Sequence, residues 1–320
     1  MTALSTFELT KDYAVGFWRK RPYRALDHLT LDVAEGEVFG FLGPNGAGKT
    51  TTLKLLMQLV FPTSGRAEIL GRPLGDLGAR QRIGFLPENP YFYDYLTAEE
   101  LLTYFAALFG YRGAERRARA SRMLDEVGLG AERRMPLRKF SKGMLQRVGI
   151  AQALVNDPEL VILDEPMSGL DPLGRRDVRA LILRLRDSGC TVFFSSHVLS
   201  DAEALCNRVA ILARGRLITA GRLTDMLALR AGGWELVVAG ASDALIASVG
   251  SRVRRAVRIS EGRYTLDLPL EPAPEHLLAD LTRAGAHLVS LNPVRQTLED
   301  FFVEQVTAPD VLATSRGLDA

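Results

Sequence analysis

Residues 43–51 read Gly-Pro-Asn-Gly-Ala-Gly-Lys-Thr-Thr, and this stretch decides the fold prediction. Its spacing of glycines, lysine and threonine matches the phosphate-binding loop pattern G-x-x-x-x-G-K-[ST]. A short apolar run over 38–42 comes before it, and residues 51–60 follow with the apolar spacing of a helix. The sequence therefore predicts a buried strand, a glycine-rich loop and a helix, which together bind a nucleoside triphosphate.

Each residue of this loop is a candidate contact to the nucleotide. Glycines allow successive backbone N–H groups to curve around an anion, and the N-terminus of the next helix adds partial positive charge. We expect Lys49 to reach the outer phosphates and the Thr50 hydroxyl to hold Mg²⁺. The predicted nucleotide contacts are Gly43, Pro44, Asn45, Gly46, Ala47, Gly48, Lys49, Thr50 and Thr51.

The composition indicates a globular protein of about two domains. The chain has 320 residues, and its 40 basic and 38 acidic side chains give a net charge of +2. Because the charges nearly balance, the composition gives no reason to expect a nucleic-acid partner. Two cysteines exclude a disulfide framework. The first ten residues lack a signal peptide pattern, and no window reaches about 18 apolar residues, so we expect a cytoplasmic protein.

The order of predicted elements indicates an α/β fold. Apolar runs between Gly or Asp turns predict strands at 7–9, 30–33, 37–42, 66–69 and 83–86, the second and third joined by a hairpin-like connection. A helical subdomain over about 90–155 follows, and its first helix carries a capping box with Thr97 as N-cap. Strands at 160–163 and 191–195, linked by a helix, form a parallel βαβ unit, and a hairpin around Gly215 closes the domain.

The last third of the chain has a different pattern. Gly232 and Gly233 mark a domain boundary. Beyond them the predicted order is βαββαβ, the ferredoxin-like arrangement, followed by a helix over 297–305. The predicted domains are residues 1–230, an accessory domain at 234–306 and a disordered tail at 307–320.

Two adjacent carboxylates, Asp164 and Glu165, end the apolar strand at 160–163. Side chains alternate along a strand, so these neighbours can do different work. After a phosphate-binding loop, an aspartate in this place holds the Mg²⁺ shell, and the next carboxylate can polarise the attacking water. Without the loop upstream, the same pair would fit a solvated acidic turn equally well.

Three more motifs make the pattern specific. Phe140-Ser141-Lys142-Gly143-Met144-Leu145-Gln146-Arg147 opens a helix before the carboxylates, Ser168-Gly169-Leu170-Asp171 follows them, and His197 comes after the next strand. With these motifs the chain resembles the ATP-binding subunits of ABC transporters over residues 5–225. The octet resembles the family's signature motif, usually Leu-Ser-Gly-Gly-Gln. The resemblance implies a P-loop ATPase domain, with a mixed sheet core plus a helical subdomain, joined here to a small α+β ferredoxin-like domain.

The resemblance also implies roles for single residues. In this family two domains enclose two ATP molecules, and the P-loop of one domain faces the signature of the other. By position, Glu165 is the expected general base and His197 the γ-phosphate contact, while Asp164 holds the Mg²⁺ shell. Ser141, Lys142 and Gly143 would bind the partner's ATP, and Asp171 would contact the partner domain. For Lys142 a second reading stays open, in which it points to solvent.

Two further positions are less clear. The family stacks an aromatic ring on adenine ahead of the P-loop, and Tyr13 is the expected residue, with Phe17, Trp18 and Tyr23 as competitors. A glutamine usually follows the strand at 83–86, but here Glu88 stands there. Its carboxylate could still accept a hydrogen bond from Mg²⁺-bound water, so Glu88 is kept as a candidate near the metal.

These departures are similar to one branch of the family, the ATPases of ABC-2-type exporters. That branch often has Pro-Glu after the strand, Ser-Lys-Gly-Met in the signature, and an ending like that of residues 297–302. The resemblance implies an integral-membrane permease as partner, a homodimer or a heterodimer with a related ATPase, and a place at the inner face of the membrane. The aromatic segment 90–96 would dock the permease or pack within the subdomain. The alternatives are a soluble ABC ATPase that works without a permease, and a P-loop kinase, which needs no signature motif.

Overall fold

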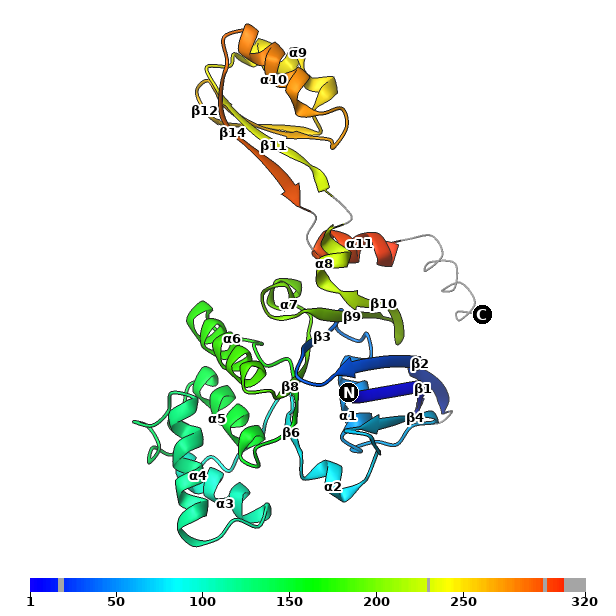
Figure 1. The fold of residues 1–320 in the computed structure, drawn as a ribbon, viewed down its shortest axis with the longest axis vertical. Helices are drawn as coiled ribbons and strands as arrows, with labels where there is room; N and C mark the ends of the chain where they lie inside the picture. The colour runs from blue at the N-terminus through cyan, green and yellow to red at the C-terminus, as the bar shows by residue number, and fades with distance from the viewer. Residues whose placement is uncertain (17–19, 229–230, 296–297, 308–320) are drawn as a thin grey trace. The chain divides into compact units, whose positions relative to one another are not determined.

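The computed structural model describes residues 1–16, 20–228, 231–295 and 298–307 (Figure 1). The chain divides into two compact units at Leu223 and Thr224. Within the described ranges no helix combines the length and apolar character needed to span a bilayer.

The first unit is built around a six-stranded sheet. Its order is β10-β9-β3-β8-β7-β6, and all neighbours are parallel except β9 and β10. All residues of β3, β7 and β8 are buried, which explains their nearly continuous apolar runs. The strands are β3 (Val38–Leu42), β6 (Ile83–Leu86), β7 (Leu160–Asp164), β8 (Thr191–Ser196), β9 (Arg208–Ala213) and β10 (Arg216–Arg222).

A second, antiparallel sheet of order β2-β1-β4-β5 belongs to the same unit. It consists of β1 (Thr2–Val15), β2 (Arg21–Ala34), β4 (Ser64–Ile69) and β5 (Arg72–Pro73). Helix α1 (Lys49–Leu56) contacts strands of both sheets, and its leucines belong to the core that joins them. The prediction of a hairpin-like connection from the second to the third strand is wrong, because β2 and β3 lie in different sheets.

Helices cover the other face of the six-stranded sheet. Here α5 (Lys142–Leu154) contacts β6, while α6 (Pro172–Asp187) and α7 (Leu199–Leu205) contact β3 and β8. The α5 contact is close, since a Cβ at Gly84 of β6 would lie 2.0 Å from the Ala153 carbonyl oxygen. As predicted, α6 links β7 to its parallel neighbour β8.

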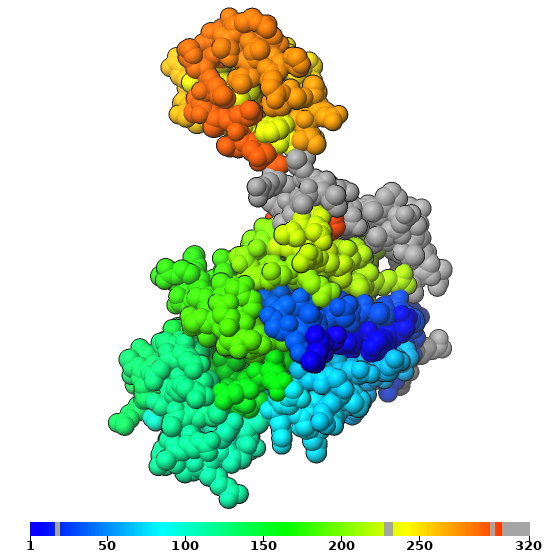
Figure 2. Space-filling model, viewed as in Figure 1, coloured from blue at the N-terminus to red at the C-terminus, as the bar shows by residue number. Residues whose placement is uncertain are grey.

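A helical segment follows β6 and the short helix α2 (Leu77–Arg80). It contains α3 (Ala98–Leu108), α4 (Gly113–Glu126), a 3-10 turn η1 (Leu137–Lys139) and then α5. The predicted capping box is confirmed: Thr97 accepts from the Glu100 backbone N–H, and the Glu100 side chain accepts from the Thr97 N–H. In Figure 2 the blue-green atoms of this segment form a separate lobe of the first unit's surface.

The second unit contains a four-stranded antiparallel sheet of order β12-β13-β11-β14. Helices α9 and α10 contribute to the apolar core on one face of it, which gives the predicted ferredoxin-like arrangement. Gly233 lies inside β11 rather than in a linker, and a Cβ there would lie 1.9 Å from the Leu268 carbonyl oxygen. The elements are α8 (Leu223–Ala228), β11 (Ala231–Ala239), α9 (Asp243–Ser248), η2 (Gly250–Arg252), β12 (Arg255–Ser260), β13 (Arg263–Leu268), α10 (Pro274–Arg283), β14 (His287–Arg295) and α11 (Leu298–Thr307).

Some predictions fall outside the described residues. These are the competitors Phe17 and Trp18, position 297 at the start of the last predicted helix, and the predicted tail from residue 308 onward.

Candidate functional site

The glycine-rich loop runs from the end of β3 to the N-terminus of α1, and two of its glycines are required by close contacts. A Cβ at Gly43 would lie 2.4 Å from the Leu212 carbonyl oxygen, and a Cβ at Gly48 would lie 2.6 Å from that of Ala25. Both also have positive φ angles, 156° and 105°. Larger residues would push the loop off β9 and β2, so the glycines set the shape of the loop.

The loop forms one wall of a cleft of about 330 Å³. In this cleft most of the loop lies beside predicted site residues that are distant in sequence. They include Glu165, the expected general base, and Glu88, which stands where the family usually has a glutamine. It is lined by Tyr13, Tyr23, Ala25, Asn45, Gly46, Gly48, Lys49, Thr50, Thr51, Glu88 and Glu165.

Lys49 is buried in this cleft, with 6% of its side chain exposed. Its ammonium donates to the carbonyl oxygens of Gly43 at 2.7 Å and Pro44 at 3.2 Å. It also lies 3.3 Å from Glu165 Oε1. The lysine is therefore held at the mouth of the loop by contacts that an incoming phosphate can replace.

Asp164 and Glu165 are tied together by a residue whose role the sequence did not reveal. The Ser195 hydroxyl donates to Asp164 Oδ1 at 2.6 Å and accepts from the Glu165 backbone N–H at 2.9 Å. Burial raises the pKa of Asp164, which hydrogen bonds from Ser195 and Thr50 oppose and the nearby charges of Glu88 and Glu165 reinforce. Only the position of Ser195 at the end of a strand beside β7 could have suggested this role.

Glu165 is fixed from its other side by His197. The His197 Nδ1 atom lies 2.8 Å from Glu165 Oε2. Glu165 also has a φ of 50°, which a residue with a side chain adopts at a cost of about 1–3 kcal/mol. Such strain is concentrated at functional positions, and here it turns a buried carboxylate toward both the lysine and the histidine.

The oxygen atoms around Asp164 suit Mg²⁺. The Thr50 hydroxyl hydrogen-bonds to the Asp164 carboxylate and lowers the pKa of Asp164, whereas the nearby negative charge of Glu88 raises it. Among the residues that the structure describes, no cluster of three His, Cys, Asp or Glu side chains could enclose a metal. Mg²⁺ fits such a set, because it commonly uses one or two carboxylates together with substrate phosphates.

Several predicted residues do not line the cleft. Ser141 caps the N-terminus of α5 by accepting from the Met144 N–H at 3.2 Å. Asp171 caps α6 in the same way, through the Gly174 N–H at 2.8 Å. The Lys142 ammonium lies against Gly169, where a Cβ would be 2.1 Å from it.

Two aromatic residues line the cleft, where the sequence predicts one. Tyr13 and Tyr23 are opposite each other in the β1–β2 hairpin, and both line the cleft. The Lys11 ammonium lies 5.1 Å from the centre of the Tyr13 ring. The structure thus keeps Tyr13 as a candidate for stacking on adenine, together with its predicted competitor Tyr23.

Comparison with known proteins agrees with this geometry. The model of the ABC transporter family matches residues 26–168. An uncharacterised ABC transporter ATP-binding protein of Synechocystis is 46% identical over 95% of this chain and 84% of its own length. The linearmycin resistance ATP-binding protein of Bacillus subtilis is 34% identical over 86% and 91%. A dimeric ATP-binding cassette solved in a post-hydrolysis state with ADP and Pi is 30% identical, with a TM-score of 0.62 over 69% of this chain and 98% of the other.

Proposed function

The chain belongs to the family of ABC transporter ATP-binding proteins, and we propose that it is the ATP-hydrolysing subunit of an ABC-2-type exporter. It binds ATP and acts as an ATPase. The observation that carries the site assignment is that the buried Glu165 carboxylate lies 3.3 Å from the buried Lys49 ammonium and 2.8 Å from His197 Nδ1. The proposed ATPase domain is residues 1–230, including the helical subdomain at 90–155, and residues 234–306 are an accessory domain.

The geometry supports a simple order of events in hydrolysis. Lys49 exchanges its contacts to Glu165 and the loop carbonyls for the phosphates of ATP. Glu165 is then free to take a proton from water, with His197 holding the carboxylate and contacting the γ-phosphate. Glu165 already lines the cleft, and His197 reaches it through the contact at 2.8 Å, so little of the site has to be rebuilt when ATP enters.

Mg²⁺ would be held by Thr50 and Asp164, with Glu88 accepting from a bound water. When bound, it would neutralise charge on the phosphate oxygens. Ser195 keeps the Asp164 carboxylate oriented toward this position.

The site would be completed by a second copy or a related ATPase. Ser141 and Gly143 are at the start of α5 and do not line the cleft of their own chain. Their hydroxyl and backbone N–H groups at a helix N-terminus suit a γ-phosphate presented by another chain. Asp171, on the loop after Glu165, is the proposed contact to that partner.

The proposed membrane partner is a permease that binds beside Glu88, which would place the chain in the cytoplasm on the inner face of the membrane. Three tyrosines there are too exposed to be core: Tyr91, Tyr93 and Tyr95 have 92%, 54% and 66% of their surface accessible. Exposed tyrosines are enriched in protein interfaces. The direction of transport is proposed from the variant motifs and from the relative that confers linearmycin resistance.

The first test measures whether the protein forms a dimer when it binds ATP. We expect Glu165→Gln to bind ATP without hydrolysing it and to double in mass in light scattering with MgATP. The control is Glu159→Gln, a half-exposed carboxylate before β7 that pairs with Arg82 and lies outside the cleft. A Glu165→Gln protein that stays monomeric with saturating ATP would contradict the composite site. Wild-type protein that releases no phosphate would contradict the site assignment itself.

A further inference from the structure

The nucleotide cleft has walls from two different sheets, and the turn between β9 and β10 joins them. The two tyrosines come from the β1–β2 hairpin, whereas the lysine loop follows β3. The Gly215 N–H donates to the Ala47 carbonyl oxygen of the loop at 2.9 Å. The Gly215 carbonyl oxygen accepts from the Asp27 N–H of β2 at 2.8 Å. The backbone of one glycine thus contacts both walls.

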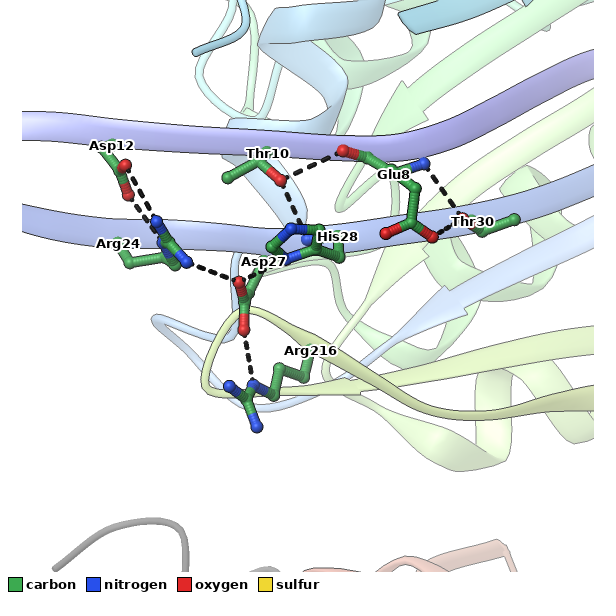
Figure 3. A network of polar contacts seen from close by, with 8 residues as sticks. All are labelled: Glu8, Thr10, Asp12, Arg24, Asp27, His28, Thr30 and Arg216. Carbon is green, nitrogen blue, oxygen red and sulfur yellow. Dashed lines mark hydrogen bonds and ion pairs between the residues drawn. The ribbon is translucent and has the colours of Figure 1, made fainter. Parts of the chain in front are cut away.

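The Asp27 carboxylate strengthens this joint through three neighbours (Figure 3). Arg216 Nε donates to Oδ2 at 2.7 Å, Arg24 Nη1 donates to Oδ1 at 2.9 Å, and His28 Nδ1 lies 2.8 Å from Oδ1. Only 9% of the Asp27 side chain is exposed, whereas both arginines are at least half exposed. Burial would raise the pKa of Asp27, but the hydrogen bonds from His28, Arg216 and Arg24 together lower it. The carboxylate is therefore charged and held on two sides.

The network continues from Asp27 to the tyrosine pair. Arg24 uses its Nε and Nη2 atoms to donate to both oxygens of Asp12, at 2.9 and 3.2 Å. Asp12 and Arg24 face each other across the hairpin, and the next pair along it is Tyr13 and Tyr23. A fork of two parallel hydrogen bonds fixes the relative orientation of two strands better than a single contact does.

We propose that Asp27 is a positioning residue that sets the spacing between the base end and the phosphate end of the nucleotide site. On one side it holds Arg216, next to the turn that contacts the lysine loop. On the other it holds Arg24, next to the tyrosines. A ligand with both a base and phosphates needs this spacing, whereas a ligand of phosphates alone needs only the loop. The proposal rests on the proposed function, because it requires that the nucleotide occupies this cleft with its base at the tyrosines.

The test compares two probes that are not turned over, ADP and inorganic pyrophosphate, by calorimetry with the full chain and Mg²⁺. We expect Asp27→Ala to weaken ADP binding roughly tenfold, within the range that stacking of a base contributes, and to leave pyrophosphate within about twofold. The matched control is Asp32→Ala, on the same strand, which removes a pair with Arg208 of β9 and should change neither affinity. In a Tyr13→Ala, Tyr23→Ala background, the Asp27→Ala effect on ADP should disappear.

The outcomes separate the possible roles. Equal weakening of both probes by Asp27→Ala would indicate general damage to the loop and overturn the proposal, as would unchanged ADP binding. If Asp27→Ala fails to fold, Arg216→Ala replaces it. Arg216 is exposed, and its substitution removes the same ion pair between Asp27 and the turn. Wild-type protein that binds ADP no better than pyrophosphate would overturn the placement of the base, and with it the proposal. Wild-type protein that binds neither would refute the proposed function itself.

Discussion

Replacing Ser195 by alanine tests whether the two carboxylates after β7 depend on a neighbouring strand. The substitution removes the donor to Asp164 Oδ1 and the acceptor of the Glu165 N–H, and both atoms are buried. A buried polar group that loses its partner costs about 1–3 kcal/mol, so two such losses predict a destabilisation of about 3 kcal/mol. That is a large part of the roughly 5–15 kcal/mol that stabilises a typical domain.

The assay is urea denaturation in which unfolding is monitored through hydrogen exchange of the β7 and β8 amides. This local readout is needed because the two units of the chain need not unfold together. Ser196→Ala is the control: Ser196 is also buried, but its hydroxyl exchanges hydrogen bonds, at 2.9 and 3.2 Å, with the backbone of Val198, which is partly exposed. The deficit of Ser195→Ala should shrink below the raised pKa of Asp164, since a protonated carboxyl needs its donor less. A loss no larger than that of Ser196→Ala would refute the reasoning.

Three further predictions concern other parts of the chain. Glu165→Gln should bind ATP roughly tenfold more tightly, about 1.4 kcal/mol, because the carboxylate no longer competes for the lysine; calorimetry with Glu159→Gln as control would show it, and equal affinities would contradict it. Gly84→Ala should lower the free energy of unfolding of the first unit by about 1–3 kcal/mol, measured by urea denaturation, because the new Cβ would clash with the Ala153 carbonyl oxygen of α5. Burial raises the pKa of Cys190 to about 11 and that of Cys206 further, so both thiols should resist iodoacetamide at pH 8 until denaturant is added. Mass spectrometry measures the labelling, and rapid modification of the native protein would count against this prediction.

Local patterns predicted most of the fold. The loop at 43–51, the capping box at Thr97 and the buried strands are each recognisable within about ten residues, because their causes are local: backbone freedom, helix capping and apolar periodicity. The order of elements in the second unit, read from the same signals, corresponds to the observed sheet.

What the sequence did not predict depends on contacts between distant segments. The strands predicted at 7–9 and 30–33 extend to 2–15 and 21–34, because pairing with each other sustains them where apolar alternation is weak. The sequence named Tyr23 as a competitor of Tyr13, but only the register of that hairpin places the two tyrosines opposite each other. Gly233 is required by a backbone atom of β13, a reason for glycine that cannot be distinguished in sequence from a flexible linker.

The division of the cleft between two sheets has a consequence for the purified protein. A nucleotide that contacts both walls binds only the folded chain, so mass action adds to stability: at 100 times the dissociation constant the gain is about 2.7 kcal/mol. Protein freed of nucleotide by dialysis should therefore melt at a lower temperature and be cut sooner by proteases than the same chain kept with ADP. Storage and crystallisation trials should start from the loaded form.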